Sequence, residues 1–472
     1  METGGNMTGW QEARLISVAG ISSDKEAEQR ATSALLAVLS IVRPFSNAVL
    51  TPMGASRAER AHVETFIETP FTTPSGTNVR PDGLIRVSYG KQDPWVALVE
   101  VKTGNSKLDE DQVSNYLTVA KDQGFDCVLT ISNEIPPSPG VHPTGIKLRS
   151  NSKVDLHHIS WTRILTTAVM EKLHNGIDDP EQAWILGELI RYLEHPSSGA
   201  IGFDDMGENW NSIRDGARQG SLSKRTEGIT DIAQRWDQLL GFTSLKLGAD
   251  IGQDVHEVVS RSELNDPSLR TKGFVESLAS DSRLEGSLRI PDTISDLDIE
   301  VDLKARQNIL SIAFDAPSDK GGKGRVGWLV RQLKDAPGQL VIEAYTKNAR
   351  SGMAATLADV REDTGVLIGD DKKDPYKFRL VARSEMGTGR KNGKKPGFSK
   401  AIINSVEAFY GDILQDLVGY QPRAPRLRDR APEVASEPLP TVDLIEPTID
   451  LTDSSPEKPA IAAALQRWSV DW

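Results

Sequence analysis

The chain has 472 residues, a formal net charge of −12, 38% hydrophobic residues and 26% charged residues, as expected for a globular protein of two or three domains. Its longest apolar run, Ala34 to Val42 with Ser40 inside it, is far shorter than the roughly 20 residues that a membrane span needs. No secretory leader is expected and Cys127 is the single cysteine, so the composition excludes an intramolecular disulfide and predicts a cytoplasmic protein.

The first predicted elements are a helix over residues 24–39 and a strand over residues 63–69. Glu28 lies at helical spacing with the apolar residues Ala31 and Leu35, so the helix carries a carboxylate on its core-facing stripe. One interpretation is that Glu28 only complements the dipole at the start of the helix. The other is that it contributes to a functional site.

Two further strands follow and form a predicted hairpin. Residues 83–89 alternate in part between apolar and polar side chains, and residues 95–102 are almost continuously apolar. The segment between them, residues 90–94, contains glycine and proline and is typical of a turn.

The second strand of the hairpin carries two charged side chains on one face. Residues two apart in a strand point to the same side, so Glu100 and Lys102 project together while Val99 and Val101 face a core. Asp82, at the start of the neighbouring strand, can meet this face and supply a second carboxylate. The alternative interpretation is a solvated pair on an edge strand.

Two carboxylates and a lysine are the parts that metal-dependent phosphodiester cleavage uses. Carboxylate oxygens suit Mg²⁺ or Mn²⁺, and a bound cation polarises the phosphate and lowers the pKa of a water molecule. A lysine beside it can orient that water or neutralise developing charge. Asp82, Glu100 and Lys102 fit these roles.

The context of this motif adds a helix and another strand. Residues 108–122 predict a helix on which Gln112 and Tyr116, four positions apart, share one face, and residues 125–132 predict a strand. The resulting order is helix, three strands, helix, strand. Over about residues 24–165 this order resembles the PD-(D/E)xK nuclease superfamily, and the Gln112-x-x-x-Tyr116 helix resembles its RecB-like branch.

The resemblance implies a restriction-endonuclease-like domain, with a central mixed sheet flanked by helices, and assigns roles to individual residues. Asp82 and Glu100 would hold Mg²⁺ or Mn²⁺ with the backbone carbonyl of Val101, and Lys102 would assist the attacking water. The remaining assignments are supporting ones. They place Gln112 and Tyr116 along the site, Glu28 as an additional metal ligand, and Glu64 and Glu68 as weaker candidates.

The region after this domain is predicted to be mainly helical. A strand over residues 154–160 would point His157 and His158 to opposite sides, so they are not expected to share a metal ion. We expect helices over four segments and a glycine-rich connection over a fifth. The helices are 161–173, 181–193, 229–240 and 251–260, and the connection is 199–220.

From about residue 271 the pattern changes to strands with two flanking helices, which predicts an α+β domain. The predicted strands are 287–290, 296–303, 309–314, 340–345 and 376–381, and the helices are 326–333 and 400–417. Two basic loops, residues 320–325 and 383–400, are either solvated connections or contacts for a nucleic-acid backbone. The glycine and lysine spacing in the second loop does not match a phosphate-binding loop.

The last part of the sequence is acidic and rich in proline. Residues 431–472 contain eight acidic residues against Lys458 and Arg467, which predicts a disordered tail. About half of the net negative charge would therefore lie outside the folded domains, which weakens the objection that an acidic protein would not bind nucleic acid.

Together these features predict an α/β protein with four parts. They are a nuclease-like domain with a helical extension (1–198), a helical connector (199–268), an α+β accessory domain (269–420) and a disordered acidic tail (421–472). The predicted function is a metal-dependent hydrolase of phosphodiester bonds, most readily in DNA, acting in bacterial stress response, defence or DNA processing. The alternatives are a non-catalytic protein that binds nucleic acid or recruits a partner protein, and a nuclease gated by a ligand or partner.

Overall fold

The computed structural model describes residues 13–422, apart from a few short segments within that range. The segments not described are 56–57, 137–141, 150, 201, 204, 348–350, 369–372 and 388–395. The described residues all belong to one unit, Met1–Pro422. The predicted acidic tail lies outside the described residues, apart from its first two positions.

The first sheet is mixed and has five strands in the order β1-β4-β5-β6-β7. Its strands are β1 (His62–Ile67), β4 (Gly83–Ser88), β5 (Trp95–Val101), β6 (Cys127–Ser132) and β7 (Asp155–Ser160). The pairings β1–β4 and β4–β5 are antiparallel, whereas β5–β6 and β6–β7 are parallel. The predicted hairpin and the predicted order of helices and strands are confirmed, with a short β2–β3 ladder (Phe71–Thr72 and Asn78–Val79) added between β1 and β4.

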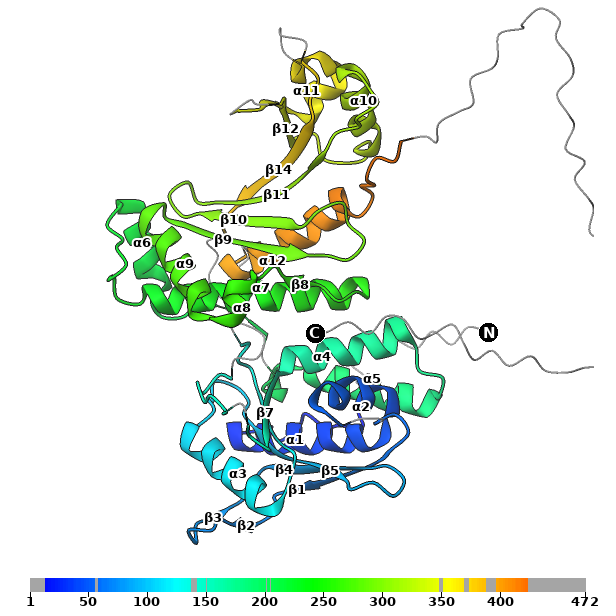
Figure 1. The fold of residues 1–472 in the computed structure, drawn as a ribbon, viewed down its shortest axis with the longest axis vertical. Helices are drawn as coiled ribbons and strands as arrows, with labels where there is room; N and C mark the ends of the chain where they lie inside the picture. Colours follow the sequence, from blue (N-terminus) through cyan, green and yellow to red (C-terminus); the bar gives the residue numbers. More distant parts are fainter. Residues whose placement is uncertain are drawn as a thin grey trace, which may run out of the picture. The chain divides into compact units, whose positions relative to one another are not determined.

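Helices cover both faces of this sheet (Figure 1). The five helices are α1 (Asp24–Ile41), α2 (Arg43–Leu50), α3 (Glu110–Gln123), α4 (Trp161–Val169) and α5 (Pro180–Leu193). Val99 and Val101 of β5 belong to one hydrophobic cluster with α1, α2, α4 and α5, while Leu98 belongs to a second cluster with α3. Both faces of β5 are therefore buried.

The helices begin where local sequence provides a cap. Ser23 accepts a hydrogen bond from the backbone N–H of Glu26 at the start of α1, and Asp109 accepts one from Gln112 at the start of α3. Gly124, with φ of 70°, ends α3 in the left-handed conformation that glycine adopts without steric cost. These caps fix the ends of the two helices that carry Glu28 and Gln112.

The second sheet has seven strands, and every neighbouring pair in it is antiparallel. In spatial order its strands are β13 (Met353–Thr356), β12 (Val341–Tyr345), β14 (Lys377–Glu385), β11 (Gln307–Asp315), β10 (Leu297–Asp302), β9 (Arg283–Arg289) and β8 (His256–Glu257). The helices of this part of the chain are α6 (Trp210–Gln219), α7 (Ile229–Ile251), α8 (Arg261–Asn265), α9 (Ser268–Ser280), α10 (Gly322–Gln332), α11 (Leu357–Glu362) and α12 (Phe398–Phe409). Short 3-10 or π segments are η1 (Thr51–Met53), η2 (Met170–Asn175), η3 (Pro196–Ser198), η4 (Thr364–Leu367) and η5 (Tyr410–Leu414).

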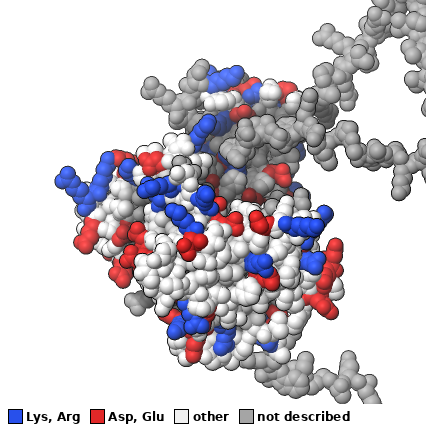
Figure 2. Space-filling model, turned by 60° about the horizontal axis from the view of Figure 1, so that its bottom comes forward, with Lys and Arg blue, Asp and Glu red and all other residues white. Residues whose placement is uncertain are grey.

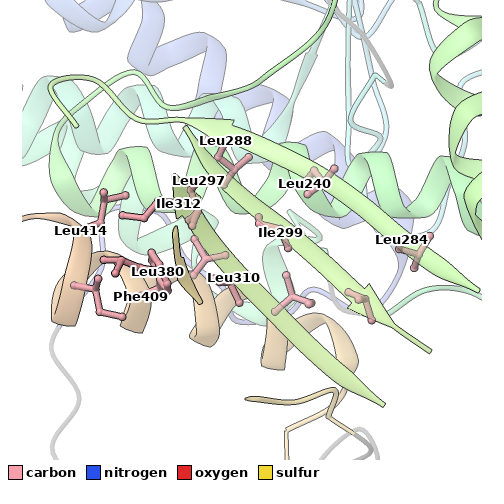
Figure 3. Close-up of a cluster of buried hydrophobic side chains, with 14 of the residues drawn as sticks. Leu240, Leu284, Leu288, Leu297, Ile299, Leu310, Ile312, Leu380, Phe409 and Leu414 are labelled. Atoms are coloured by element: carbon pink, nitrogen blue, oxygen red, sulfur yellow. The ribbon is translucent and has the colours of Figure 1, made fainter. Parts of the chain in front are cut away.

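Side chains from one face of the second sheet pack against α7 and α12 (Figure 3). Leu284 and Leu288 are four residues apart in β9 and so lie on the same face of the strand, which contacts Leu240 of α7. Phe409 of α12 and Leu414 of η5 belong to the same hydrophobic cluster, and α12 packs against β11 and β14. One hydrophobic cluster thus includes residues from both the predicted connector and the predicted α+β domain. The domain boundaries themselves stay a prediction.

Two secondary-structure predictions for this half are wrong. The expected helix over 251–260 does not form, because α7 continues to Ile251 and ends at Gly252, whose φ is 71°. The chain then pairs β8 with β9, so a tertiary contact decides the conformation of this segment. The connection 199–220 also contains a helix, α6, whose Ile213 and Ala217 are buried in the core.

Part of the first predicted basic loop, residues 320–325, belongs to a helix, and its arginine is bonded to the backbone. Residues from Gly322 onward belong to α10, and the Arg325 guanidinium donates hydrogen bonds to the carbonyls of Lys320, Ser318 and Pro375. Much of the second loop, residues 388–395, lies outside the described residues. On the face drawn in Figure 2, Lys and Arg side chains are interspersed with Asp and Glu. Nucleic-acid contacts by these loops stay a prediction.

No single helix in the described part of the chain is long and apolar enough to cross a membrane. The pair Asp24–Ile41 and Arg43–Met53, which is bent by 109°, meets that test together by length and composition alone.

Candidate active site

The predicted carboxylates meet at one end of the β4–β5 hairpin. Gly83 pairs with Val99, which places Asp82 beside Glu100 on the neighbouring strand. The Asp82 Oδ2 atom accepts a hydrogen bond of 2.8 Å from the backbone N–H of Val101. Glu100 is only 1% exposed. The hairpin register therefore brings together two carboxylates that are 18 residues apart in sequence.

The Lys102 ammonium lies between two carboxylates. Its Nζ donates a hydrogen bond of 2.5 Å to Glu100 Oε1, and it is 3.6 Å from Glu28 Oε1 on α1. The side chains of Lys102 and Glu28 are 16% and 18% exposed, so both are largely buried but retain some contact with solvent. The structure thus brings Glu28, Asp82, Glu100 and Lys102 together.

The α3 helix contributes the next two predicted residues. Gln112 Nε2 donates a hydrogen bond of 2.9 Å to the Tyr116 hydroxyl, which in turn donates one of 3.3 Å to the Arg80 carbonyl. Tyr116 is 2% exposed. Burial, and then the nearby Glu100 charge, raise the pKa of Tyr116 above its usual range, so the hydroxyl remains a neutral donor.

Burial and mutual repulsion shape the electrostatics of the carboxylates. Desolvation, followed by the charge of Asp82, raises the pKa of Glu100 to about 7, and desolvation also raises the pKa of Asp82 and of Glu28. Burial alone would lower the pKa of Lys102, but the carboxylates around it, Glu100 first, outweigh burial and raise it. The group therefore holds three carboxylates against one ammonium.

One buried oxygen of this group has no hydrogen-bond partner. Glu100 Oε2 is inaccessible to solvent and makes no hydrogen bond of ordinary geometry with a described residue, although the Tyr116 hydroxyl lies close enough to the Glu100 carboxyl to lower its pKa. An unpaired buried carboxylate oxygen is costly unless a donor or cation compensates it. Glu100 Oε2 is thus the oxygen of this group whose capacity to accept a hydrogen bond or a cation is least used.

The side chains of the two weaker candidates are engaged by arginines. Glu64 forms an ion pair of 2.9 Å with Arg86, and Glu68 forms one of 2.9 Å with Arg80 and accepts a hydrogen bond from Gln29. Both carboxylates are paired with arginines, but Glu68 lies beside Asp82: its backbone N–H donates a hydrogen bond of 3.0 Å to the Asp82 carbonyl, and, after desolvation, its charge helps to raise the pKa of Asp82. A supporting role for either residue stays a prediction.

Among the described residues, no group of three or more His, Cys, Asp or Glu side chains is arranged to hold a metal ion. The place of Glu28 among the metal ligands stays a prediction, because its contact in this group is with the Lys102 ammonium.

Comparisons with known proteins add no relative. No family model matches the chain, and no curated protein or solved structure is significantly similar to it. The residues and their geometry are therefore the basis for a functional proposal.

Sequence reasoning missed a histidine cluster beside the site. Thr130 pairs with Glu100 on one side and with His158 on the other, so the three side chains share one face of the sheet. The Thr130 hydroxyl is 2.8 Å from His142 Nε2 and 2.9 Å from His158 Nδ1. Strand register could have linked Thr130 to His158, but nothing in the sequence places His142 there.

The hydrogen bonds of this cluster can all be formed with both histidines neutral, although the Thr130 hydroxyl also lies 3.3 Å from the His157 carbonyl as a second acceptor. His158 Nε2 lies 2.8 Å from the Glu134 carbonyl and must donate, so its Nδ1 accepts from Thr130. Thr130 then accepts from His142 Nε2, and His142 Nδ1 accepts from the backbone N–H of Thr144. Burial correspondingly lowers the pKa of His142 and of His158 to about 4 each.

We expect this cluster to make stability fall in mild acid. Below the ordinary histidine pKa of about 6.5 these histidines become protonated in the unfolded chain. In the folded chain they stay neutral until the pH approaches their lowered pKa values. Each histidine should therefore contribute a fall of about 1.4 kcal/mol per pH unit to the free energy of unfolding over this window. Glu100 and Asp237, whose pKa values burial raises to about 7, contribute in the opposite direction because they bind protons in the folded chain first. Urea unfolding at pH 7.0 and 5.0 measures the slope.

The matched variant for this test is the double substitution of His142→Gln with His158→Gln. It should be less stable than the wild type at pH 7, and the difference in free energy of unfolding between the two chains should shrink between pH 7.0 and 5.0. His157, whose pKa burial also lowers, and the two carboxyls with raised pKa values act equally in both chains and cancel in this difference. A slope equal to that of the wild type would contradict the prediction.

Proposed function

We propose that this chain is a metal-dependent nuclease of the PD-(D/E)xK superfamily, RecB-like branch, with a restriction-endonuclease-like fold in its first sheet. The observation that carries the proposal is the convergence of Asp82, Glu100 and Lys102 at the end of β5, with Glu100 Oε2 left unpaired. The mixed sheet and the placement of Gln112 and Tyr116 on α3 support it.

The residues present fit a hard divalent cation. Oxygen donors of Asp82 and Glu100, with the backbone carbonyl of Val101, are the kind that Mg²⁺ and Mn²⁺ prefer, and the excess of carboxylates over ammonium favours added positive charge. When bound, such an ion polarises a phosphate and makes a water molecule more acidic. The unpaired Glu100 Oε2 is the buried atom that would gain most from a cation.

The other side chains would position substrate and water. Lys102, already hydrogen-bonded to Glu100, can donate a second hydrogen bond to the attacking water or to a phosphate oxygen as negative charge develops. The Gln112–Tyr116 pair presents a neutral hydroxyl and an amide near Glu100 and would hold the substrate or the carboxylate in place. The proposed reaction is hydrolysis of a phosphodiester bond, with DNA as the proposed substrate.

The experiment that tests the function compares four substrates. Supercoiled plasmid, linear duplex DNA, single-stranded DNA and RNA are incubated with the full chain and Mg²⁺ or Mn²⁺, with EDTA as the control. Metal-dependent cleavage would support the proposal and name the substrate class. Binding without cleavage under every condition would favour the non-catalytic alternative, and cleavage that begins only with an added factor would favour gating.

Replacing Tyr116 with phenylalanine is expected to reduce cleavage by about tenfold, because it removes the hydroxyl that links Gln112 to the Arg80 carbonyl. The cost in unfolding free energy should be about 1 kcal/mol, as for the loss of one ordinary hydrogen bond. Initial cleavage rates and urea unfolding measure the two effects. Tyr192→Phe is the control, since Tyr192 is also buried and its hydroxyl has no partner among the described residues.

A further inference from the structure

Both backbone polar groups of Lys102, its N–H and its carbonyl, are hydrogen-bonded. Its N–H donates a hydrogen bond of 2.7 Å to the Ile131 carbonyl on β6. Its carbonyl accepts a hydrogen bond of 2.9 Å from the indole Nε1–H of Trp161. Trp161, the first residue of α4, is 1% exposed. This indole donates to the catalytic strand from outside the sheet.

The turn that follows Lys102 is held by a second contact from outside the sheet. Asn133 Nδ2 donates to the Gly104 carbonyl at 2.9 Å and to the Gly199 carbonyl at 2.8 Å, and the Gly104 N–H donates to the same Gly199 carbonyl at 2.9 Å. Gly199 has φ of 73°, and a Cβ added there would meet the Thr103 Cβ at 2.8 Å. Only glycine fits this approach without displacement.

These contacts bear directly on the ammonium. A lysine side chain has four rotatable bonds, so the position of Nζ depends on a fixed starting point as well as on its partners. With both backbone groups of Lys102 bonded, Nζ reaches Glu100 Oε1 at 2.5 Å and Glu28 Oε1 at 3.6 Å. Trp161 begins α4 and Gly199 ends η3, so two segments that follow the first sheet in the chain support the residues after β5.

We propose that Trp161 and Asn133 are positioning residues for Lys102, an inference that rests on the proposed nuclease function. Trp161 fixes the carbonyl of Lys102, and Asn133 joins the turn after it to Gly199. Neither side chain touches the reacting atoms. Their effect on cleavage comes through the placement of the Lys102 ammonium.

The chain offers a matched control for Trp161. Trp236 is 0% exposed and donates its indole N–H to the Glu285 carbonyl at 2.8 Å, remote from the site. Trp161→Phe and Trp236→Phe each remove one buried indole hydrogen bond and keep an aromatic ring. We expect both to lower the urea midpoint to a similar extent, while only Trp161→Phe lowers kcat, by about tenfold, with KM for the nucleic acid unchanged.

A second readout does not depend on cleavage. Lys102 is mostly buried, and freeing its backbone should raise the rate at which acetic anhydride acetylates it, measured by mass spectrometry on the full chain. We expect a severalfold faster rate in Trp161→Phe and in Asn133→Ala, and a wild-type rate in Trp236→Phe. Labelling at the wild-type rate in both variants would overturn the proposal.

The two readouts separate the two hypotheses. Faster labelling of Lys102 in Trp161→Phe and Asn133→Ala, together with a wild-type chain that never cleaves nucleic acid, would support positioning and contradict the proposed nuclease function. Faster labelling with unchanged kcat would overturn the catalytic part of the inference. An equal loss of kcat in Trp161→Phe and Trp236→Phe would assign both to stability alone.

Discussion

Asp82→Asn is expected to lower the cleavage rate at least about 10³-fold while the fold persists, because it removes one of two anionic oxygen ligands from the proposed metal site. The asparagine Oδ1 can still accept the hydrogen bond from the Val101 N–H, so the hairpin should keep its geometry. Single-turnover cleavage at saturating Mg²⁺ measures the effect, and urea unfolding tests whether stability is retained.

The controls separate ligation from structure. Asp82→Ala leaves the Val101 N–H without its acceptor and should lower the free energy of unfolding by a further ~1–3 kcal/mol. Asp237→Asn alters another carboxylate that is 2% exposed and bonded to Arg270, away from the site. It should destabilise the chain and leave cleavage per folded molecule unchanged. Unchanged cleavage by Asp82→Ala would refute the assignment of Asp82.

Lys102→Met is expected to reduce cleavage by at least about 10²-fold, because the methionine keeps much of the side-chain volume but cannot donate a hydrogen bond to water, phosphate or Glu100. Metal binding should persist, since Lys102 is not a ligand, and the loss of its positive charge should tighten it. Titration with Mn²⁺ alongside cleavage assays measures both quantities.

Lys246→Met is the matched control for this charge. Lys246 also pairs with two carboxylates, Asp250 and Glu407, but lies on α7. We expect its loss to leave cleavage within about twofold of wild type, as is usual for a partly exposed ion pair. Equal cleavage by wild type and Lys102→Met would remove Lys102 from the mechanism and leave the site as a binding site only.

Local patterns in the sequence were sufficient for most of the first sheet. Side chains two positions apart in a strand share a face, so the prediction of a strand at β5 places Glu100 with Lys102 without any tertiary information. Helical spacing likewise places Gln112 with Tyr116, whose side chains are hydrogen-bonded in the structure. These relations depend only on residues within one turn or one strand.

The same reasoning failed where the partner of a segment lies far away in the chain. Residues 251–260 have helical spacing, yet Gly252 ends α7 and the segment pairs with β9, about 30 residues later. The glycines around α6 led to the prediction of a connection instead of a helix, although burial of Ile213 and Ala217 stabilises the helix. Propensity is overridden in both cases by packing that the local pattern does not contain.

The sequence by itself therefore determined the chemical type of the candidate site, with its two carboxylates, its lysine and the strand and helix that carry them. Only the tertiary structure decided that Glu28 reaches Lys102, that Glu100 Oε2 stays unpaired, and that Trp161 and Asn133 hold the strand end. The physical reason is that periodicity reports which side of one element a residue occupies. Which residue of another element that side chain contacts is set by how the separate elements pack, and this depends on the whole core.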